Sequence, residues 1–141
     1  MCLSHLRSIA TGIEQMRYGQ NRYNMANYDN LPVYKAAYDL LLRVYGLGQH
    51  WARDIKFTLG ERLKNELYDV LLFIYQANAT FEKSMLIEQA RLGITRVKIE
   101  IRLLHDLKQL SIKQYAGLSQ MSESVSKQLA AWSKSQKNKQ T

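Results

Sequence analysis

Arginine and lysine side chains between residues 91 and 102 are the ones whose types and spacing best suit chemistry. Arg91, Lys98 and Arg102 are separated by seven and four residues, which places them on one line of a helix, and Arg96 lies on a neighbouring line. Guanidinium groups bind phosphates through paired hydrogen bonds, and each neutralised phosphate releases a counterion. The pattern predicts an anion-binding stripe opposite the apolar face of the helix. The alternative is a solvated helix face, which the two glutamates interspersed with the stripe favour.

The histidines and acidic residues do not fall into a catalytic or metal-binding pattern. A di-iron bundle needs Glu-x-x-His pairs, whereas Arg102 stands three residues before His105 and Leu47 stands three residues before His50. The chain also lacks a glycine-rich phosphate loop, a His-Glu-x-x-His sequence and a nucleophile elbow. We therefore predict a protein that is not an enzyme and that uses neither a metal ion nor a cofactor.

The composition of the chain limits the kinds of fold and partner that these side chains can belong to. The 141 residues carry a formal net charge of +8, which favours anionic partners such as nucleic acid, an acidic protein or a membrane surface. The hydrophobic share of 46% suffices for one core, and a single proline with seven glycines argues against an all-β fold. One cysteine, Cys2, excludes an internal disulfide. Without a long apolar run or a signal peptide, the chain is predicted to be cytoplasmic.

Four segments have the hydrophobic spacing of α-helices. They run from Pro32 to about Gly48, from the Thr58 cap to about Asn78, from about Glu82 to Lys108, and from about Ile112 to Lys134. Thr58 and Glu61 have the Thr-x-x-Glu form of a capping box, and Ser111 is a second candidate cap. Gly93 inside the third helix predicts a close approach to another helix. The short connections predict an all-α fold, an antiparallel up-down-up-down four-helix bundle.

The predicted bundle occupies residues 31–134, with an N-terminal extension over residues 1–30 and a disordered basic tail over residues 135–141. In the extension, apolar residues keep helical spacing as far as Met16, and a polar run follows. Met25 within that run is either the true start of the protein or an internal residue of an N-terminal arm. The sequence leaves both interpretations open.

Three runs of residues carry a resemblance to a known family. They are LPVYKAAYDLLLRVY over residues 31–45, KFTLGERLKNE over residues 56–66, and IYQAN over residues 74–78. Through these runs the chain resembles the accessory variability determinant (Avd) family, the small four-helix-bundle proteins of diversity-generating retroelements. That family is grouped with bundle proteins encoded in ribosomal-RNA intervening sequences. The resemblance covers about residues 31–132, and residues 1–24 have no counterpart in it.

The resemblance implies a homopentameric, barrel-like assembly with a basic surface. It implies binding to the reverse transcriptase of the element and to template RNA or its DNA copy, as a non-catalytic partner in mutagenic retrohoming. Basic residues serve this binding in the family, and the nearest matches here are Arg91, Arg96, Lys98 and Arg102, with Arg62 and Lys64 as weaker candidates. The alternative is a bundle of the ribosomal-intervening-sequence type that acts as a structural or protein-interaction module.

The helix that follows Thr58 is apolar on more sides than one four-helix core requires. Its second apolar flank includes Leu72, Phe73 and Tyr75, which we expect to contact a neighbouring subunit. A membrane-surface function is disfavoured, because the leucines point toward a core and no helix carries a sustained basic amphipathic face.

Overall fold

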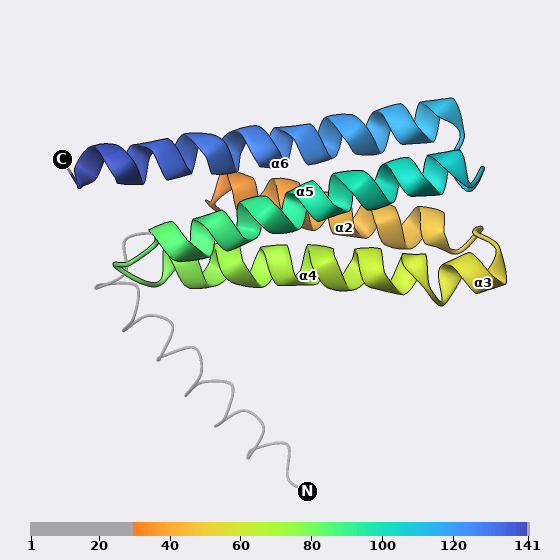
Figure 1. Ribbon diagram of the computed structural model, residues 1–141, viewed down its shortest axis with the longest axis horizontal. Helices are drawn as coiled ribbons and strands as arrows, with labels where there is room; N and C mark the ends of the chain where they lie inside the picture. The colour runs from red at the N-terminus through yellow and green to blue at the C-terminus, as the bar shows by residue number, and fades with distance from the viewer. Residues whose placement is uncertain (1–29, 141) are drawn as a thin grey trace, which may run out of the picture.

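The computed structural model describes residues 30–140, which form four long α-helices and one helix of a single turn (Figure 1). The helices are α2 (Pro32–Gly48), α3 (Arg53–Lys56), α4 (Leu59–Asn78), α5 (Ser84–Asp106) and α6 (Ile112–Lys139). This confirms the predicted all-α fold, and each long helix begins within about two residues of its predicted start. The predictions for residues 1–29, including the role of Met25, lie outside the described residues.

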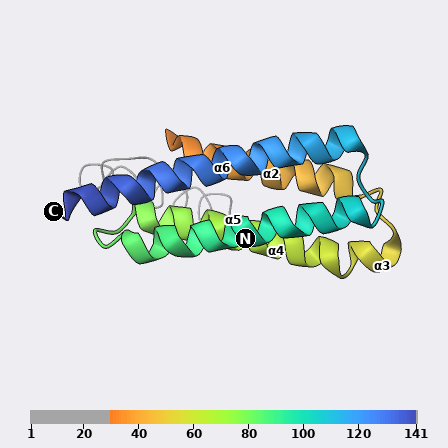
Figure 2. The same ribbon diagram turned by 45° about the horizontal axis from the view of Figure 1, so that its top comes forward.

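Neighbouring helices in the sequence are neighbours in space. Helix α4 packs against α2 and α5, and α6 packs against the same two helices. Figure 2 shows the α2–α6 pair lying beside the α4–α5 pair, with α2 and α5 on a diagonal. Successive long helices run in opposite directions (Figure 1), so the described residues form the predicted up-down-up-down bundle.

The bundle core consists of aliphatic side chains, and Gly93 permits a close contact between α5 and α4. The largest fully buried side chains include Leu40, Leu63, Leu67, Ile74, Ile94, Ile101, Leu104, Leu118 and Leu129. A Cβ atom on Gly93 of α5 would lie 2.6 Å from Cγ2 of Val70 in α4. Carbon atoms do not approach so closely, so only glycine fits without a shift of α4 or α5. The predicted close approach at Gly93 is confirmed.

Trp51 closes the end of the bundle where α2 connects to α3 and α4. Its side chain is buried, and Cβ atoms added to Gly48 or Gly60 would lie 3.3 Å from atoms of the indole ring. The neighbouring N–H of Ala52 donates a hydrogen bond of 2.8 Å to Oε1 of Gln109 in the α5–α6 turn. The two connections at this end therefore hold each other in place.

Thr58 precedes α4 but does not form the predicted capping box. Its hydroxyl donates to the carbonyl oxygen of Asp54 at 2.5 Å, and the side chain makes no capping hydrogen bond to α4. Glu61 instead lies 3.4 Å from the ammonium group of Lys64. The prediction was wrong because α3 ends at Lys56, two residues before Thr58, and the carbonyl group of Asp54 in α3 accepts the hydrogen bond of the Thr58 hydroxyl.

A complete capping box is present at the start of α6. The Ser111 hydroxyl accepts from the N–H of Gln114 at 3.1 Å, and Oε1 of Gln114 accepts from the N–H of Ser111 at 3.0 Å. This confirms Ser111 as a cap.

Helix α6 also continues to Lys139, so residues 135–139 are helical and not the predicted disordered tail. No proline or glycine interrupts the chain after Gly117, and the lysines of the last turn interact favourably with the helix dipole.

Candidate binding surfaces

The cations of α5 are divided between the two flanks of the helix. Lys98 reaches α6, where its Nζ lies 2.6 Å from Oε2 of Glu123, whereas Nη1 of Arg96 reaches α4 and lies 3.8 Å from Oε2 of Glu66. The predicted stripe therefore borders α6 and does not lie opposite the apolar face. The prediction was wrong because a spacing of seven and four residues shows which side chains share a line, but not which helix that line faces.

Arg91 belongs to a hydrogen-bonded group of three side chains. Its Nη1 lies 3.0 Å from Oε1 of Glu88 and 3.5 Å from Oγ of Ser133 in α6. The Ser133 hydroxyl donates to Glu88 at 2.5 Å. This hydrogen bond, assisted by Arg91, lowers the pKa of Glu88 below its usual value. Arg91 is thus already neutralised, and a phosphate would have to displace Glu88.

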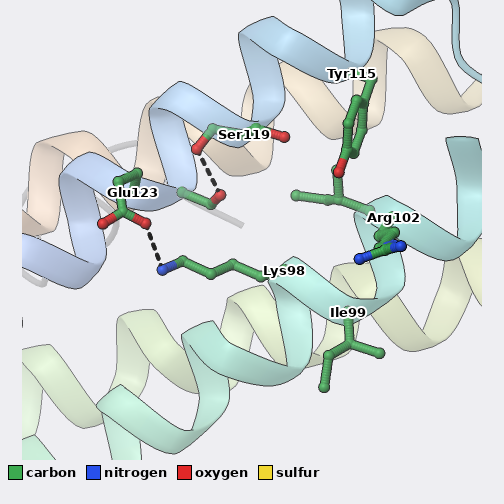
Figure 3. Close-up of a pocket in the computed structure, with 8 residues that line it drawn as sticks. Lys98, Ile99, Arg102, Tyr115, Ser119 and Glu123 are labelled. Atoms are coloured by element: carbon green, nitrogen blue, oxygen red, sulfur yellow. Dashed lines mark hydrogen bonds and ion pairs between the residues drawn. The ribbon is translucent and has the colours of Figure 1, made fainter.

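A pocket of about 320 Å³ opens between α5 and α6 (Figure 3). Lys98 and Glu123 form an ion pair at one end of it, and the hydrogen bond and charge of Lys98 lower the pKa of Glu123. Arg102 lies toward the Tyr115 end of the pocket in Figure 3. Its side chain is 76% exposed, and its ion-pair partner Asp106 is 3.9 Å away. Arg102 is therefore more accessible to a partner than Lys98 is.

The two weaker candidates on α4 differ in their accessibility. The Lys64 side chain is only 12% exposed, with Nζ 3.4 Å from Glu61 and 4.6 Å from the centre of the Tyr45 ring. These contacts hold the ammonium group against the bundle through an ion pair and a cation–π interaction. Arg62 is exposed at the surface, and its charge acts on the buried carboxyl group of Glu100.

Glu100, one of the two glutamates interspersed with the predicted cationic stripe, is a buried carboxyl group. The residue is 7% exposed, and its Oε2 has no hydrogen-bond partner among the described residues. Burial, followed by the charge of Glu66, raises the pKa of Glu100 to about 7, while Arg62 and Arg96 oppose the rise. The signal in the sequence is its spacing of three and four residues from core positions of the same helix.

The outer surface of α5 combines exposed apolar side chains with arginines. Leu92, Ile99 and Leu103 are between 44% and 63% exposed and follow one another at seven and four residues. Arg96 lies between Leu92 and Ile99, and Arg102 lies three residues after Ile99. Figure 3 shows Ile99 pointing away from α6. We call these five residues the α5 outer face, and their mixture of aliphatic and guanidinium groups is typical of a protein-binding surface.

A second apolar surface lies between α2 and α4. Tyr38, Tyr68, Leu72 and Tyr75 help to line a groove of about 300 Å³, and we call these four residues the α2–α4 groove. Each is at least 42% exposed. Of the three residues predicted to contact a neighbouring subunit, Leu72 and Tyr75 line this groove, whereas Phe73 packs against the edge of the core.

A metal cluster and a membrane-spanning helix are both absent from the described part of the chain. Between residues 30 and 140, no three His, Cys, Asp or Glu side chains lie together as a metal site. No helix in the same range has the length and hydrophobicity needed to cross a lipid bilayer.

Residues 32–136 match the protein family described as bAvd-like. The match begins at the start of α2 and ends near the end of α6, so it includes the four long helices, the α5 outer face and the α2–α4 groove. No curated protein matches the chain.

Proposed function

The chain belongs to the bAvd-like family, and from this premise we propose that it is a non-catalytic accessory protein of a diversity-generating retroelement. In this role it binds the reverse transcriptase of the element together with template RNA or its DNA copy, and so supports mutagenic retrohoming. The three runs of residues that resemble Avd proteins lie on α2 and α4 and at the α3–α4 junction, within the matched region.

The α5 outer face is the observation that carries this proposal. A phosphate backbone would neutralise Arg96 and Arg102 but would leave Leu92 and the other apolar side chains of the face in water. A protein partner covers the apolar groups and, because they exclude water, strengthens the hydrogen bonds of the adjacent guanidinium groups. We therefore propose that the reverse transcriptase docks on this face.

The other cations predicted to bind nucleic acid or polymerase contribute unequally to this surface. Arg62 of α4 lies near the Arg96 side of the α5 outer face, because Arg62 and Arg96 both act on the carboxyl group of Glu100. Arg91 and Lys98 bind a phosphate only after releasing their glutamate partners. Lys64, which is held by Glu61 and the Tyr45 ring, contributes mainly by positioning α4 against α2.

We further propose that copies of the chain assemble through the α2–α4 groove. Resemblance to the Avd family implies a homopentameric barrel, and a ring of five needs a contact between two different surfaces of neighbouring subunits. The exposed Leu72 and Tyr75 provide one of these surfaces, and Phe73 supports them from the edge of the core.

Co-purification with the polymerase tests the proposed function. The full chain, carrying an affinity tag, is produced together with the reverse transcriptase of the proposed retroelement, and both proteins are followed through washes at physiological salt. We expect the polymerase to remain bound to the tagged chain. A polymerase that passes through the column, although both proteins are folded, contradicts the proposal.

A further inference from the structure

The second half of α6 is rich in lysines that form no close ion pair among the described residues. Helix α6 contains five lysines and a single glutamate, Glu123, which is paired with Lys98 of α5. Beyond Glu123 the helix has no acidic residue but has lysines at positions 127, 134, 137 and 139. All four are exposed, and none has an ion-pair partner within 4.0 Å among residues 30–140. This differs from α5, where each cation has an acidic partner.

Three of these lysines share one side of the helix. Lys134 follows Lys127 by seven residues and Lys137 follows Lys134 by three, so their side chains project from one side over a length of about 15 Å. We call these three residues the α6 lysine face. Figures 1 and 2 show that the end of α6 projects beyond the ends of the neighbouring helices. The face is thus accessible to a partner as large as a nucleic acid.

Positive charge also accumulates at the adjacent end of the bundle. Lys83, between α4 and α5, donates a hydrogen bond of 2.7 Å to the carbonyl oxygen of Ala77. Its pKa is lowered by partial burial and then by the charge of Lys139. Two lysines that repel each other beside the α6 lysine face extend a region where an anion would be stabilised.

Helix-end electrostatics do not explain the whole face. Cations near the C-terminus of a helix are stabilised by the helix dipole, which accounts for Lys137 and Lys139 in the last turn. The dipole effect falls off within that turn and does not reach Lys127. A surface that serves only solubility mixes charges of both signs, whereas α6 after Glu123 carries lysines alone. The nearest acidic groups act at longer range, because Lys127 lowers the pKa of Glu123 and Lys137 lowers that of Glu88 without a close ion pair.

The residues around the α6 lysine face indicate which polyanion it suits. Between Glu123 and Lys139 no large apolar side chain is exposed, so the face lacks the groups that enter a membrane or form the centre of a protein interface. Within α6 the face also lacks an exposed aromatic ring on which a base could stack, and the exposed ring of Phe81 lies outside α6, two residues before Lys83. What remains is a row of point charges suited to phosphate groups, without base recognition.

We propose that the α6 lysine face, Lys127, Lys134 and Lys137, binds the phosphate backbone of nucleic acid independently of sequence. The proposal rests on the proposed function for the choice of nucleic acid as the partner. It assigns the nucleic acid to α6 and leaves the α5 outer face to the polymerase. The two partners then occupy separate surfaces of one chain.

Fluorescence anisotropy with the purified full chain tests this assignment. The probes are a labelled RNA hairpin and a labelled DNA hairpin of the same sequence, each titrated at several salt concentrations. The test variant combines Lys127→Gln, Lys134→Gln and Lys137→Gln. The control variant combines Arg43→Gln, Arg53→Gln and Lys113→Gln, which remove the same charge from exposed positions nearer the other end of the bundle.

We expect the test variant to bind both hairpins at least about tenfold more weakly at low salt. The slope of the logarithm of the binding constant against the logarithm of the salt concentration should become less steep by about 0.7–0.9 for each lost phosphate contact. The control variant should bind as the unmodified chain does. Equal weakening in both variants would show that net charge alone attracts the hairpins and would overturn the proposal. Loss for only one hairpin identifies that nucleic acid as the ligand and supports the proposal.

Polymerase capture separates this proposal from the proposed function. The test variant should retain the reverse transcriptase on the column, because the α5 outer face is unchanged. If the unmodified chain captures the polymerase but binds neither hairpin, the assignment of nucleic acid to α6 is overturned and the proposed polymerase contact stands. If the unmodified chain binds the hairpins through α6 but does not capture the polymerase, the proposed polymerase contact is overturned and the assignment of nucleic acid to α6 stands.

Discussion

The guanidinium group of Arg96 lies 3.8 Å from the carboxylate of Glu66 and links the outer surfaces of α5 and α4. Both side chains are partly exposed, so the pair contributes at most about 1 kcal/mol to stability. Arg96 also opposes the rise in the pKa of Glu100, which Glu66 promotes. A change to Arg96→Glu would gather three carboxyl groups at this point, whereas Arg96→Gln removes the positive charge without adding a negative one. The second change is therefore suited to testing partner binding.

Gly93→Ala is expected to destabilise the bundle by about 1–3 kcal/mol, because the new Cβ would lie 2.6 Å from Cγ2 of Val70. Urea unfolding followed by circular dichroism measures the change. Gly117→Ala is the matched control, since nothing lies within 4 Å of its Cβ position, and it should stabilise α6 by about 0.5–1 kcal/mol. Adding Val70→Ala to Gly93→Ala should recover part of the loss. Equal effects of the two glycine changes would contradict the close contact of α4 and α5.

Glu100→Gln is expected to stabilise the protein at high pH more than at low pH. The pKa of Glu100 is raised to about 7, so between its usual value and about 7 the folded state binds more protons than the unfolded state. The free energy of unfolding of the unmodified chain therefore falls as the pH rises through this range. The advantage of Glu100→Gln should grow over the same range and reach about 2–3 kcal/mol near pH 9. Thermal unfolding across pH measures it, and a constant difference would contradict the assignment.

Ser111→Ala and Gln114→Ala should each lower the stability of α6, because each removes one of the two reciprocal hydrogen bonds of its capping box. The expected cost for Ser111→Ala is about 1 kcal/mol. Glu61→Gln serves as the comparison in α4, where no capping box forms, and it should change stability by only a few tenths of a kcal/mol, since it weakens a 3.4 Å ion pair in which the Glu61 side chain is half exposed. Chemical denaturation measures all three, and a loss at Glu61 as large as that at Ser111 would contradict the observed caps.

Leu72→Glu together with Tyr75→Glu should break the proposed contact between subunits. Both side chains are more than two-fifths exposed, so the single chain should tolerate charge there, whereas a buried subunit contact should not. Light scattering after gel filtration measures the mass of the assembly. We expect the unmodified chain to form a pentamer and the variant to form monomers with unchanged helix content. A variant that keeps the full assembly would place the contact elsewhere.

The sequence was sufficient to predict the four long helices, because their hydrophobic spacing is regular and Pro32 marks the start of α2, but it did not predict the single turn of α3. It also predicted the close contact at Gly93, where glycine inside a helix has no other evident reason. These features depend on residues close together in the chain or on one helix face. Local patterns of this kind can be recognised in the sequence without a structure.

The functional surfaces were less predictable, because they depend on contacts between helices. The spacing of Lys98 and Arg96 did not show that one faces α6 and the other α4. The Thr-x-x-Glu pattern at Thr58 failed because the carbonyl group of Asp54 in α3 competes for the hydroxyl. Burial of Glu100 likewise depends on how closely α4 and α5 pack, which charge patterns in a sequence do not reveal.

Capture of the reverse transcriptase by variants of the α5 outer face tests the central claim most directly. The test variant combines Arg96→Gln, Ile99→Ser and Arg102→Gln, all at exposed positions, and the control combines Arg43→Gln with Arg53→Gln to remove the same charge. We predict that the test variant folds, keeps its hairpin binding and loses the polymerase at physiological salt, while the control keeps it. Undiminished capture by the folded test variant would contradict docking of the polymerase on this face.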